Sequence, residues 1–377
     1  MIAIGIGAVC LAIWLTLIFA RGGFWLAREQ DSRESPGDCT AWPEIVAIVP
    51  ARDEADVIAR SITGLLNQDY PGPFKVILVD DSSSDGTAET ARACGDTQRL
   101  EILSARPLPP GWTGKLWAMV QGVEQAGAGP AYLWFSDADI ETMPDTLRTL
   151  VSRAEAGRLT LVSLMAKLRC ETFAERALIP AFVFFFQMLY PFARVNRPSG
   201  VGAAAGGCML VRRDSLSAAG GIEAIRTALI DDCTLGALLK RHGPIWLGLT
   251  DRVRSIRPYD DLGSIAAMIS RSAYAQLGYS PIKLAGTLLG LALVYGAPPA
   301  LALFGNGWAR IAGVTAWLLM AIAFQPMLRF YRRSPLWGLA LPLIAAFYAA
   351  CTLLSAWQHM QGRGGMWKGR TQATGMR

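Results

Sequence analysis

Two aspartates one residue apart, Asp137 and Asp139, directly follow the apolar run 131–135. Two carboxylates at this spacing, just beyond a strand, can share a divalent cation with a diphosphate. Mg²⁺ and Mn²⁺ prefer oxygen ligands, and sites that handle nucleotides often use only one or two protein carboxylates. The pattern is common by chance, so the prediction of a metal site depends on what surrounds it.

The elements that must position these aspartates are strands and helices in alternation. Short apolar runs bounded by turn residues lie at 45–49, 74–79, 100–103, 131–135 and 159–165. Between the first two runs, Ile58, Ile62, Leu65 and Leu66 recur at helical spacing. This alternation predicts a parallel sheet covered by helices on both faces.

In such a sheet the ligand lies at the carboxyl ends of the strands. The polar clusters of the chain fall at those ends. They are Arg52-Asp53-Glu54 after the first run, Asp80-Asp81 after the second and Asp137-Asp139 after the fourth. The three clusters together predict one binding edge.

Four stretches carry no Asp, Glu, Lys or Arg: residues 2–20, 284–309, 311–328 and 334–362. An uncharged apolar stretch of about 18 residues can span a bilayer as a helix. Any one of them could be a buried core helix, but four in one chain predict membrane spans. The first stretch lacks the basic start and the cleavage site of a signal peptide, which favours an uncleaved anchor.

The basic residues near the ends of these stretches predict the orientation, because Lys and Arg accumulate on the cytoplasmic side. They are Arg21 and Arg28 after the first stretch and Arg329, Arg332 and Arg333 after the third. Residues 21–283 are therefore expected in the cytoplasm, in a multi-pass protein of the inner (cytoplasmic) membrane. A fourth span would put the tail outside, which conflicts with its basic residues Arg363, Lys368, Arg370 and Arg377. Either the last stretch is partly re-entrant or the tail charge is tolerated.

These patterns predict four parts. They are an N-terminal transmembrane anchor at 1–22, a cytoplasmic α/β domain at 40–280, three C-terminal membrane helices at 281–360 and a basic tail at 361–377. Residues 173–192 are apolar and aromatic but interrupted by prolines, and are expected to form an in-plane interfacial segment or a buried helix.

The net charge of +6 is modest, and nothing in the chain indicates nucleic-acid binding. The seven cysteines are dispersed without a Cys-x-x-Cys pair, which favours a reducing compartment over a disulfide framework. Arg252, Arg254 and Arg257 stand close together and are expected to form a juxtamembrane patch on anionic lipid headgroups.

The ordered motifs over about residues 44–275 resemble family 2 glycosyltransferases of the GT-A fold. The motifs are Val49 to Glu54, Val79 to Thr87, Gly114 to Ala118, Asp137 to Asp139 and Asp231-Asp232. Gly111 to Lys115 and the C-terminal spans are most similar to transferases associated with hopanoid (hopene) biosynthesis. Membrane ceramide glucosyltransferases are more distantly similar.

The resemblance implies a GT-A domain, with N- and C-terminal transmembrane helices around it, that transfers a hexose from a nucleotide-diphosphate sugar, expected to be a UDP-sugar, to a lipid. Asp139 and Asp137 would hold Mg²⁺ or Mn²⁺, and Asp232 would be the catalytic base. The donor-binding residues it implies are Pro50, Ala51, Arg52, Glu54, Asp81, Lys115, Asp137 and Arg271. The acceptor-side residues are Gly206, Gly207 and Asp231.

Each assignment has a structural alternative. Asp80 to Thr87 would also form an Asx turn and a helix cap, Lys115 could be a surface lysine, and Asp231 or Asp232 could merely cap a helix. His242 is expected at the surface. The Gln/Arg-x-x-Arg-Trp element of processive members is reduced to Arg271, which predicts the transfer of one or few sugars.

Three functions remain open. The first is transfer of a sugar to a lipid hydroxyl or, instead, to a polyprenyl phosphate. The second is a non-catalytic membrane scaffold with a nucleotide-binding fold. The third is a nucleotidyl- or phosphotransferase, which would release pyrophosphate.

Overall fold

The computed structural model describes residues 1–32, 41–95, 98–368 and 370–371, so Cys39, Arg377 and part of the expected tail lie outside the described residues. The chain divides into two compact units. Unit 1 comprises Met1–Arg28, Cys170–Ala193 and Tyr259–Gly365, and unit 2 comprises Glu29–Arg169, Arg194–Pro258 and the chain from Met366 onward. These bounds differ from the expected parts, because 170–193 and 259–280 group with the apolar helices whereas Met366 onward groups with unit 2.

Unit 2 is built on an eight-stranded sheet in the order β3-β2-β1-β4-β7-β6-β8-β5. Its strands are β1 (Ile45–Ala51), β2 (Phe74–Asp80), β3 (Leu100–Ser104), β4 (Tyr132–Ser136), β5 (Ile140–Thr142), β6 (Leu161–Lys167), β7 (Cys208–Arg212) and β8 (Ile245–Ser255). The five predicted strands are confirmed as β1, β2, β3, β4 and β6.

The prediction of a uniformly parallel sheet is wrong. β3, β2, β1 and β4 are parallel neighbours, but β7 runs antiparallel to both β4 and β6, and β5 runs antiparallel to β8. β7 is short and ends at Arg212. In β8 the exposed residues Asp251 and Arg254 lie among buried residues. Neither β7 nor β8 is therefore a long continuous apolar run in the sequence.

The helices of unit 2 are α2 (Ala55–Leu66), α3 (Thr87–Arg92), α4 (Gly114–Ala126), α5 (Thr146–Gly157), α8 (Arg213–Ala218) and α9 (Asp231–Lys240), with a 3-10 turn η2 (Ile222–Ile225). The predicted helical spacing after β1 is confirmed, since Ile58, Ile62 and Leu65 of α2 are fully buried. Burying each of these side chains contributes about 1.5–3 kcal/mol to the free energy of folding. Apolar packing thus holds α2 and the loop before it on the sheet.

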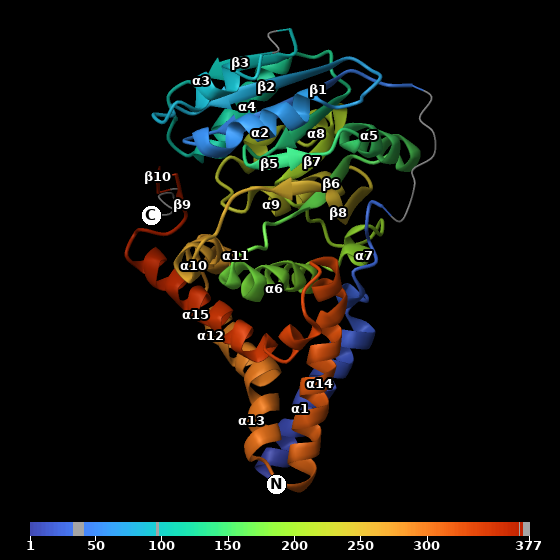
Figure 1. The fold of residues 1–377 in the computed structure, drawn as a ribbon, viewed down its shortest axis with the longest axis vertical. Helices are drawn as coiled ribbons and strands as arrows, with labels where there is room; N and C mark the ends of the chain where they lie inside the picture. The colour runs from blue at the N-terminus through green and yellow to red at the C-terminus, as the bar shows by residue number, and fades with distance from the viewer. Residues whose placement is uncertain (33–40, 96–97, 369, 372–377) are drawn as a thin grey trace. The chain divides into compact units, whose positions relative to one another are not determined.

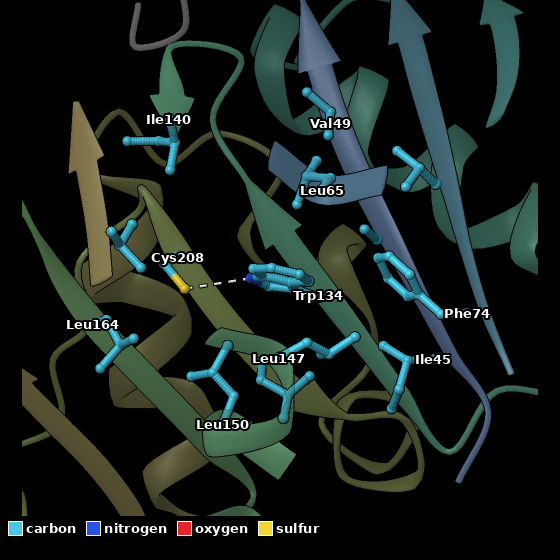
Figure 2. Packing of buried hydrophobic residues seen from close by; sticks show 14 of the residues in the cluster. Ile45, Val49, Leu65, Phe74, Trp134, Ile140, Leu147, Leu150, Leu164 and Cys208 are labelled. Carbon is cyan, nitrogen blue, oxygen red and sulfur yellow. Dashed lines mark hydrogen bonds between the residues drawn. The ribbon is translucent and has the colours of Figure 1, made fainter. Parts of the chain in front are cut away.

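The core of unit 2 centres on Trp134 of β4, which lies among Phe74, Leu147 and Leu150 (Figure 2). Its indole Nε1 donates a hydrogen bond to Cys208 Sγ of β7 at 3.3 Å, so the one polar atom of this buried ring has a partner. This contact joins β4, three residues before Asp137, to its antiparallel neighbour β7, directly after Gly207.

Unit 1 is helical. Its elements are α1 (Ile2–Ala20), η1 (Phe24–Leu26), α6 (Phe173–Leu189), α10 (Leu262–Ser270), α11 (Ala273–Gln276), α12 (Pro281–Leu291), the π-helix η3 (Ala292–Gly296), α13 (Ala297–Phe304), α14 (Gly307–Phe330), η4 (Pro335–Gly338) and α15 (Leu341–Met360). The short helix α7 (Phe192–Val195) runs from unit 1 into unit 2.

Five segments of unit 1 and its border are long and apolar enough to cross a membrane: Ile2–Ala20, Phe173–Val195, Pro281–Phe304, Gly307–Phe330 and Leu341–Met360. Helix α1 lies along α13 and α14 (Figure 1). Trp14 Nε1 donates to the carbonyl of Val294 at 2.9 Å. Val294 belongs to the π-helix η3, and single π-helical turns of this kind occur inside longer α-helices.

Candidate functional site

The loops after β1 and β2 are tied together by side chains of the Asp80–Thr87 motif. The backbone N–H of Glu54 donates to Thr87 Oγ1 at 2.8 Å, and that of Ala55 donates to Asp85 Oδ2 at 2.9 Å. Asp85 Oδ1 also accepts from the N–H of Thr87 at 3.0 Å. The predicted Asx turn is therefore confirmed at Asp85, whereas α3 has Gly86 at its N-cap and no side-chain capping bond.

The loop after β1 is held in an uncommon backbone conformation. Asp53 has φ 50°, in the left-handed region that non-glycine residues rarely adopt. Its carboxylate accepts from the N–H of Ser84 at 2.9 Å, and its own N–H donates to Ser83 Oγ at 2.9 Å. These reciprocal bonds hold the two loops as one surface at the carboxyl ends of the strands.

Asp81 lies beneath this surface with 2% of its area exposed. Its N–H donates to the carbonyl of Ala51 at 2.8 Å. Arg52 Nη1 donates to the carbonyl of Asp81 and lies 3.8 Å from its carboxylate Oδ2. Pro50, Ala51, Arg52 and Asp81 are thus brought together, as the sequence predicts for one binding segment.

Lys115 joins two further predicted residues. It lies in the first turn of α4, and its Nζ is 2.8 Å from Asp137 Oδ1 and 2.9 Å from Asp231 Oδ2. Burial lowers the pKa of Lys115, but the two carboxylates outweigh it and the net shift is upward. Lys115 is therefore a charged clamp between β4 and α9 and not a free surface lysine.

Asp232 lies beside this clamp, in the first turn of α9. Its Oδ2 accepts from the N–H of Gly206 at 2.9 Å, and its Oδ1 accepts from the N–H of Cys233 at 2.7 Å. Burial and the adjacent Asp231 raise the pKa of Asp232 to about 6, against the opposing charge of Lys115. A carboxyl group with such a pKa is ionised at neutral pH and is basic enough to take a proton.

Two glycines set the position of α9. A Cβ on Gly236 would lie 2.5 Å from the carbonyl carbon of Ala203, and one on Gly202 would lie 2.5 Å from Cα of Ala237. Only glycine at these positions allows the helix to approach the 202–206 segment so closely. The close approach brings Asp232 onto Gly206. Gly207 packs against Ile140 and Ala166 instead.

Asp139 belongs to a second group of charges. Arg257 Nε lies 2.8 Å from Asp139 Oδ2, while Arg257 Nη2 lies 2.6 Å and 2.7 Å from the two oxygens of Glu54. Lys368 Nζ lies 3.0 Å from Glu54 Oε1. We call Lys368, Glu54, Arg257 and Asp139 the charge chain, because positive and negative groups alternate along it.

The expected juxtamembrane arginine patch is wrong for two of its three members. Arg257 is in the charge chain, and Arg252 pairs with Asp31 at 3.0 Å and with Asp145 at 2.9 Å inside unit 2. Arg257 and Lys368 are residues of this group that the sequence did not indicate as site residues. Arg257 follows β8, a strand that the sequence did not reveal, so nothing marked Arg257 as facing the aspartates.

The aspartate pair fits a hard divalent cation. Burial raises the pKa of Asp137, Lys115 opposes this rise, and the nearby carboxylate of Asp139 adds to it. The two carboxylates therefore lie close enough to repel each other. Among the described residues no group of three or more His, Cys, Asp or Glu side chains could hold a metal ion. A cation here would complete its shell with water and substrate phosphates, as Mg²⁺ commonly does.

Arg271 stands apart from this description. It is at the C-terminus of α10 in unit 1, so its donor-binding role stays a prediction. His242 is exposed, as expected.

The part of the chain that is similar in sequence to known proteins includes most strands of the unit 2 sheet. Residues 46–220 match the model described as glycosyl transferase family 2. The chain is 32% identical over 149 residues to the succinoglycan biosynthesis protein ExoO of Rhizobium meliloti, covering 37% of this chain and 40% of that protein. It is 31% identical over 122 residues to the glycosyltransferase AglE of Haloferax volcanii, covering 32% and 38%. The matched segment thus spans about two fifths of the length of these relatives.

One solved structure is similar over nearly its whole length. It is the mannosyltransferase PcManGT of Pyrobaculum calidifontis in complex with GDP-Man and Mn²⁺, with a TM-score of 0.56. The match covers 94% of this chain and 99% of that one at 16% sequence identity, which shows a shared fold. The expected GT-A-like α/β architecture is confirmed, with a mixed sheet.

Proposed function

We propose, because residues 46–220 match the glycosyl transferase family 2 model, that this protein is a membrane-bound inverting glycosyltransferase. It moves a sugar from a nucleotide-diphosphate donor to the hydroxyl group of a lipid. The observation that carries the proposal is the convergence of Lys115, Asp137, Asp231 and Asp232 from three separate elements. Titratable groups with shifted pKa values, here Lys115, Asp137 and Asp232, are typical of a catalytic site when they gather in this way.

Asp232 acts as the base. As the acceptor oxygen attacks the anomeric carbon, its hydroxyl proton passes to the Asp232 carboxylate, and the bond from the anomeric carbon to the diphosphate oxygen breaks. Because Gly206 and Cys233 donate to its two oxygens, the carboxylate is held in one orientation before the substrate arrives. Gly206 and Asp231 lie on the acceptor side of this proposal.

The donor occupies the surface formed by the loops after β1 and β2. Asp81 accepts a hydrogen bond from the nucleobase of the donor. Pro50, Ala51, Arg52 and Glu54 lie around the nucleobase and the ribose. A UDP-sugar is the donor expected from the sequence. The solved mannosyltransferase holds GDP-Man and Mn²⁺, which supports a sugar nucleotide but leaves the base to be measured.

Asp139 and Asp137 would hold Mg²⁺ or Mn²⁺, which supplies Lewis-acid stabilisation of the leaving diphosphate when bound. Asp139 would then exchange its contact with Arg257 for the cation. Lys115 opposes the rise that burial causes in the pKa of Asp137, and it orients the Asp137 carboxylate through the 2.8 Å ion pair.

Membrane attachment is supported by the five long apolar helices and by the order of the chain. Unit 2 is assembled from three stretches, and one folded unit lies on one side of a bilayer. Phe173–Val195 leaves unit 2 and returns to it, so we infer that it does not cross. Because both ends of the chain from Pro258 to Met366 belong to unit 2, we infer an even number of crossings, so at least one of the three C-terminal candidates does not span.

This topology removes the conflict over the basic tail. If α1 crosses once and two of the three C-terminal segments cross as a pair, the tail shares a compartment with unit 2. Arg363 and Lys368 then lie on the cytoplasmic side, as the distribution of basic residues in membrane proteins favours. The proposed location is the inner membrane with the catalytic unit in the cytoplasm.

The acceptor is proposed to be a lipid alcohol, with a hopanoid as the class suggested by the sequence resemblance. The test is lipid mass spectrometry of cells that carry the wild-type protein or the Asp139→Ala variant. A lipid that loses the mass of one sugar in the variant identifies both the sugar and the acceptor. Identical lipid profiles in cells that contain equal amounts of both proteins would contradict the proposal.

A further inference from the structure

The chain returns to unit 2 after α15 and places one basic side chain against the loop after β1. Strands β9 (Met366–Trp367) and β10 (Arg370–Thr371) pair antiparallel, and Lys368 follows β9. Lys368 Nζ donates to the carbonyl of Asp53 at 2.8 Å and lies 3.0 Å from Glu54 Oε1. Arg52 Nε donates to the carbonyl of Lys368 at 3.3 Å.

One tail residue therefore contacts three consecutive residues, 52, 53 and 54, that carry the proposed nucleotide surface. The ion pair of Lys368 with Glu54 is largely shielded from water. The side chain of Lys368 is 22% exposed and that of Glu54 is 9% exposed. Burial raises the pKa of Glu54, and the charges of Arg257 and Lys368 oppose that rise. Lys368 thus acts as a counter-ion inside the site and not as part of a surface patch.

The electrostatics of the site call for such a cation. Carboxylates outnumber basic groups along this edge. The carboxylates are Asp53, Glu54, Asp80, Asp81, Asp137, Asp139, Asp231 and Asp232, and the basic groups that pair with them in the described part of the chain include Arg52, Lys115, Arg257 and Lys368. A diphosphate adds further negative charge, so its binding requires every cation that can reach it.

Two basic side chains of the charge chain, Arg257 and Lys368, can exchange their present contacts for contacts with a bound donor. Lys115 is already shared by two carboxylates. Arg257 bridges Glu54 and Asp139, and Lys368 contacts Glu54 from the other end of the chain. A donor that engages Asp139 through its cation would release one contact of Arg257. The diphosphate would then be the strongest anion near both Arg257 and Lys368.

We propose that Lys368 is a donor-binding residue, supplied by a part of the chain that follows the last apolar helix. The ammonium group exchanges its contact with Glu54 for one with the donor's phosphates. This inference rests on the proposed function and adds a residue from beyond the family 2 match, which ends at residue 220.

The direct test is calorimetric titration of the full chain in detergent with UDP or GDP and Mn²⁺. Lys368→Ala should weaken binding about tenfold to a hundredfold, because a charge-assisted contact to phosphate is lost. Lys368→Arg should retain most of the affinity. The matched control is Lys75→Ala, which removes an exposed lysine near the start of β2, away from the carboxyl ends of the strands, and should change nothing.

A second readout follows the tail itself. Trypsin cleaves after lysine, and nucleotide with Mn²⁺ should slow cleavage after Lys368 in the wild-type protein. Unchanged affinity of Lys368→Ala, or a gain in affinity that would make the tail inhibitory, would overturn the inference. Absence of any nucleotide binding by the wild-type protein would instead overturn the proposed function and this inference with it.

Discussion

The backbone N–H of Gly206 donates a 2.9 Å hydrogen bond to Oδ2 of Asp232, across 26 residues of sequence. This bond fixes one face of a carboxylate whose pKa is raised to about 6 by burial and by Asp231. It requires α9 to lie against the 202–206 segment, which glycines at 202 and 236 permit. Local packing and acid–base chemistry are therefore coupled at this point.

The first prediction concerns the proposed base. Asp232→Asn should reduce kcat by about 10²–10⁴-fold if the acceptor is an alcohol, because general-base catalysis contributes that range. A polyprenyl phosphate is already an anion, and with it the variant should stay nearly fully active. Turnover is measured with radiolabelled donor and extracted lipid. Asp56→Asn, at an exposed position in α2, is the matched control.

The second prediction concerns pH. Because the pKa of Asp232 is raised to about 6, the base is protonated below that value and kcat/KM should fall about tenfold per pH unit there. The same upward shift means that the ionised form costs folding free energy above pH 6, whereas protonation relieves this cost. Asp232→Asn should therefore not lower the melting temperature at pH 8. A pH–rate profile that stays level from pH 7 to pH 5 would argue against Asp232 as the base.

The third prediction concerns the bridge made by Arg257. Arg257→Ala leaves Glu54 and Asp139 without their shared cation and should destabilise unit 2 by about 2 kcal/mol, since breaking a partly buried ion pair leaves an uncompensated charge. Arg257→Lys should rescue only partly, because an ammonium group lacks the planar fork that reaches both carboxylates. Arg60→Ala removes an exposed pair with Glu141, with side chains 60% and 39% exposed, and should cost less than about 1 kcal/mol. Thermal unfolding measures all three, and equal losses for Arg257→Ala and Arg60→Ala would contradict the bridging role.

The fourth prediction concerns the close packing of α9. Gly236→Ala should force α9 away from Ala203, lowering both stability and kcat, because overpacking costs about 1–3 kcal/mol. Gly290→Ala is the control, since a Cβ there meets nothing within 4 Å. Circular dichroism melts and turnover are compared side by side. Full activity of Gly236→Ala would show that the Asp232 position tolerates a shift of the helix.

The fifth prediction concerns topology. In intact cells a membrane-impermeant maleimide should label Asn306→Cys, in the turn between α13 and α14, but not Arg363→Cys. The latter should become reactive only after permeabilisation, together with Asp56→Cys in the catalytic unit. Labelling of Arg363→Cys from outside would place the tail opposite unit 2 and would also refute the role of Lys368. The wild-type protein supplies the background from its own cysteines.

The sequence predicted much of the parallel half of the sheet, because β1, β2 and β4 are buried on both faces and therefore read as continuous apolar runs. It also predicted that Asp81, Asp137 and Asp139 follow those strands, since the ends of parallel strands meet at one edge. It did not predict β7 or β8. The apolar run of β7 ends at Arg212, and Asp251, Arg252 and Arg254 interrupt that of β8, so neither strand is evident until it pairs with neighbours far away in the chain.

Residue types and their local spacing were thus sufficient to indicate two aspartates beyond a strand, a lysine opening a helix and a pair of acids at another helix start. Which charges meet was decided only by the tertiary structure. Arg257 reaches Asp139 across 118 residues and Lys368 reaches Glu54 across more than 300, and no local pattern encodes such pairs. The physical reason is that ion pairing depends on distance in space and on shared burial. Both are set by the antiparallel strands and by the return of the chain to unit 2.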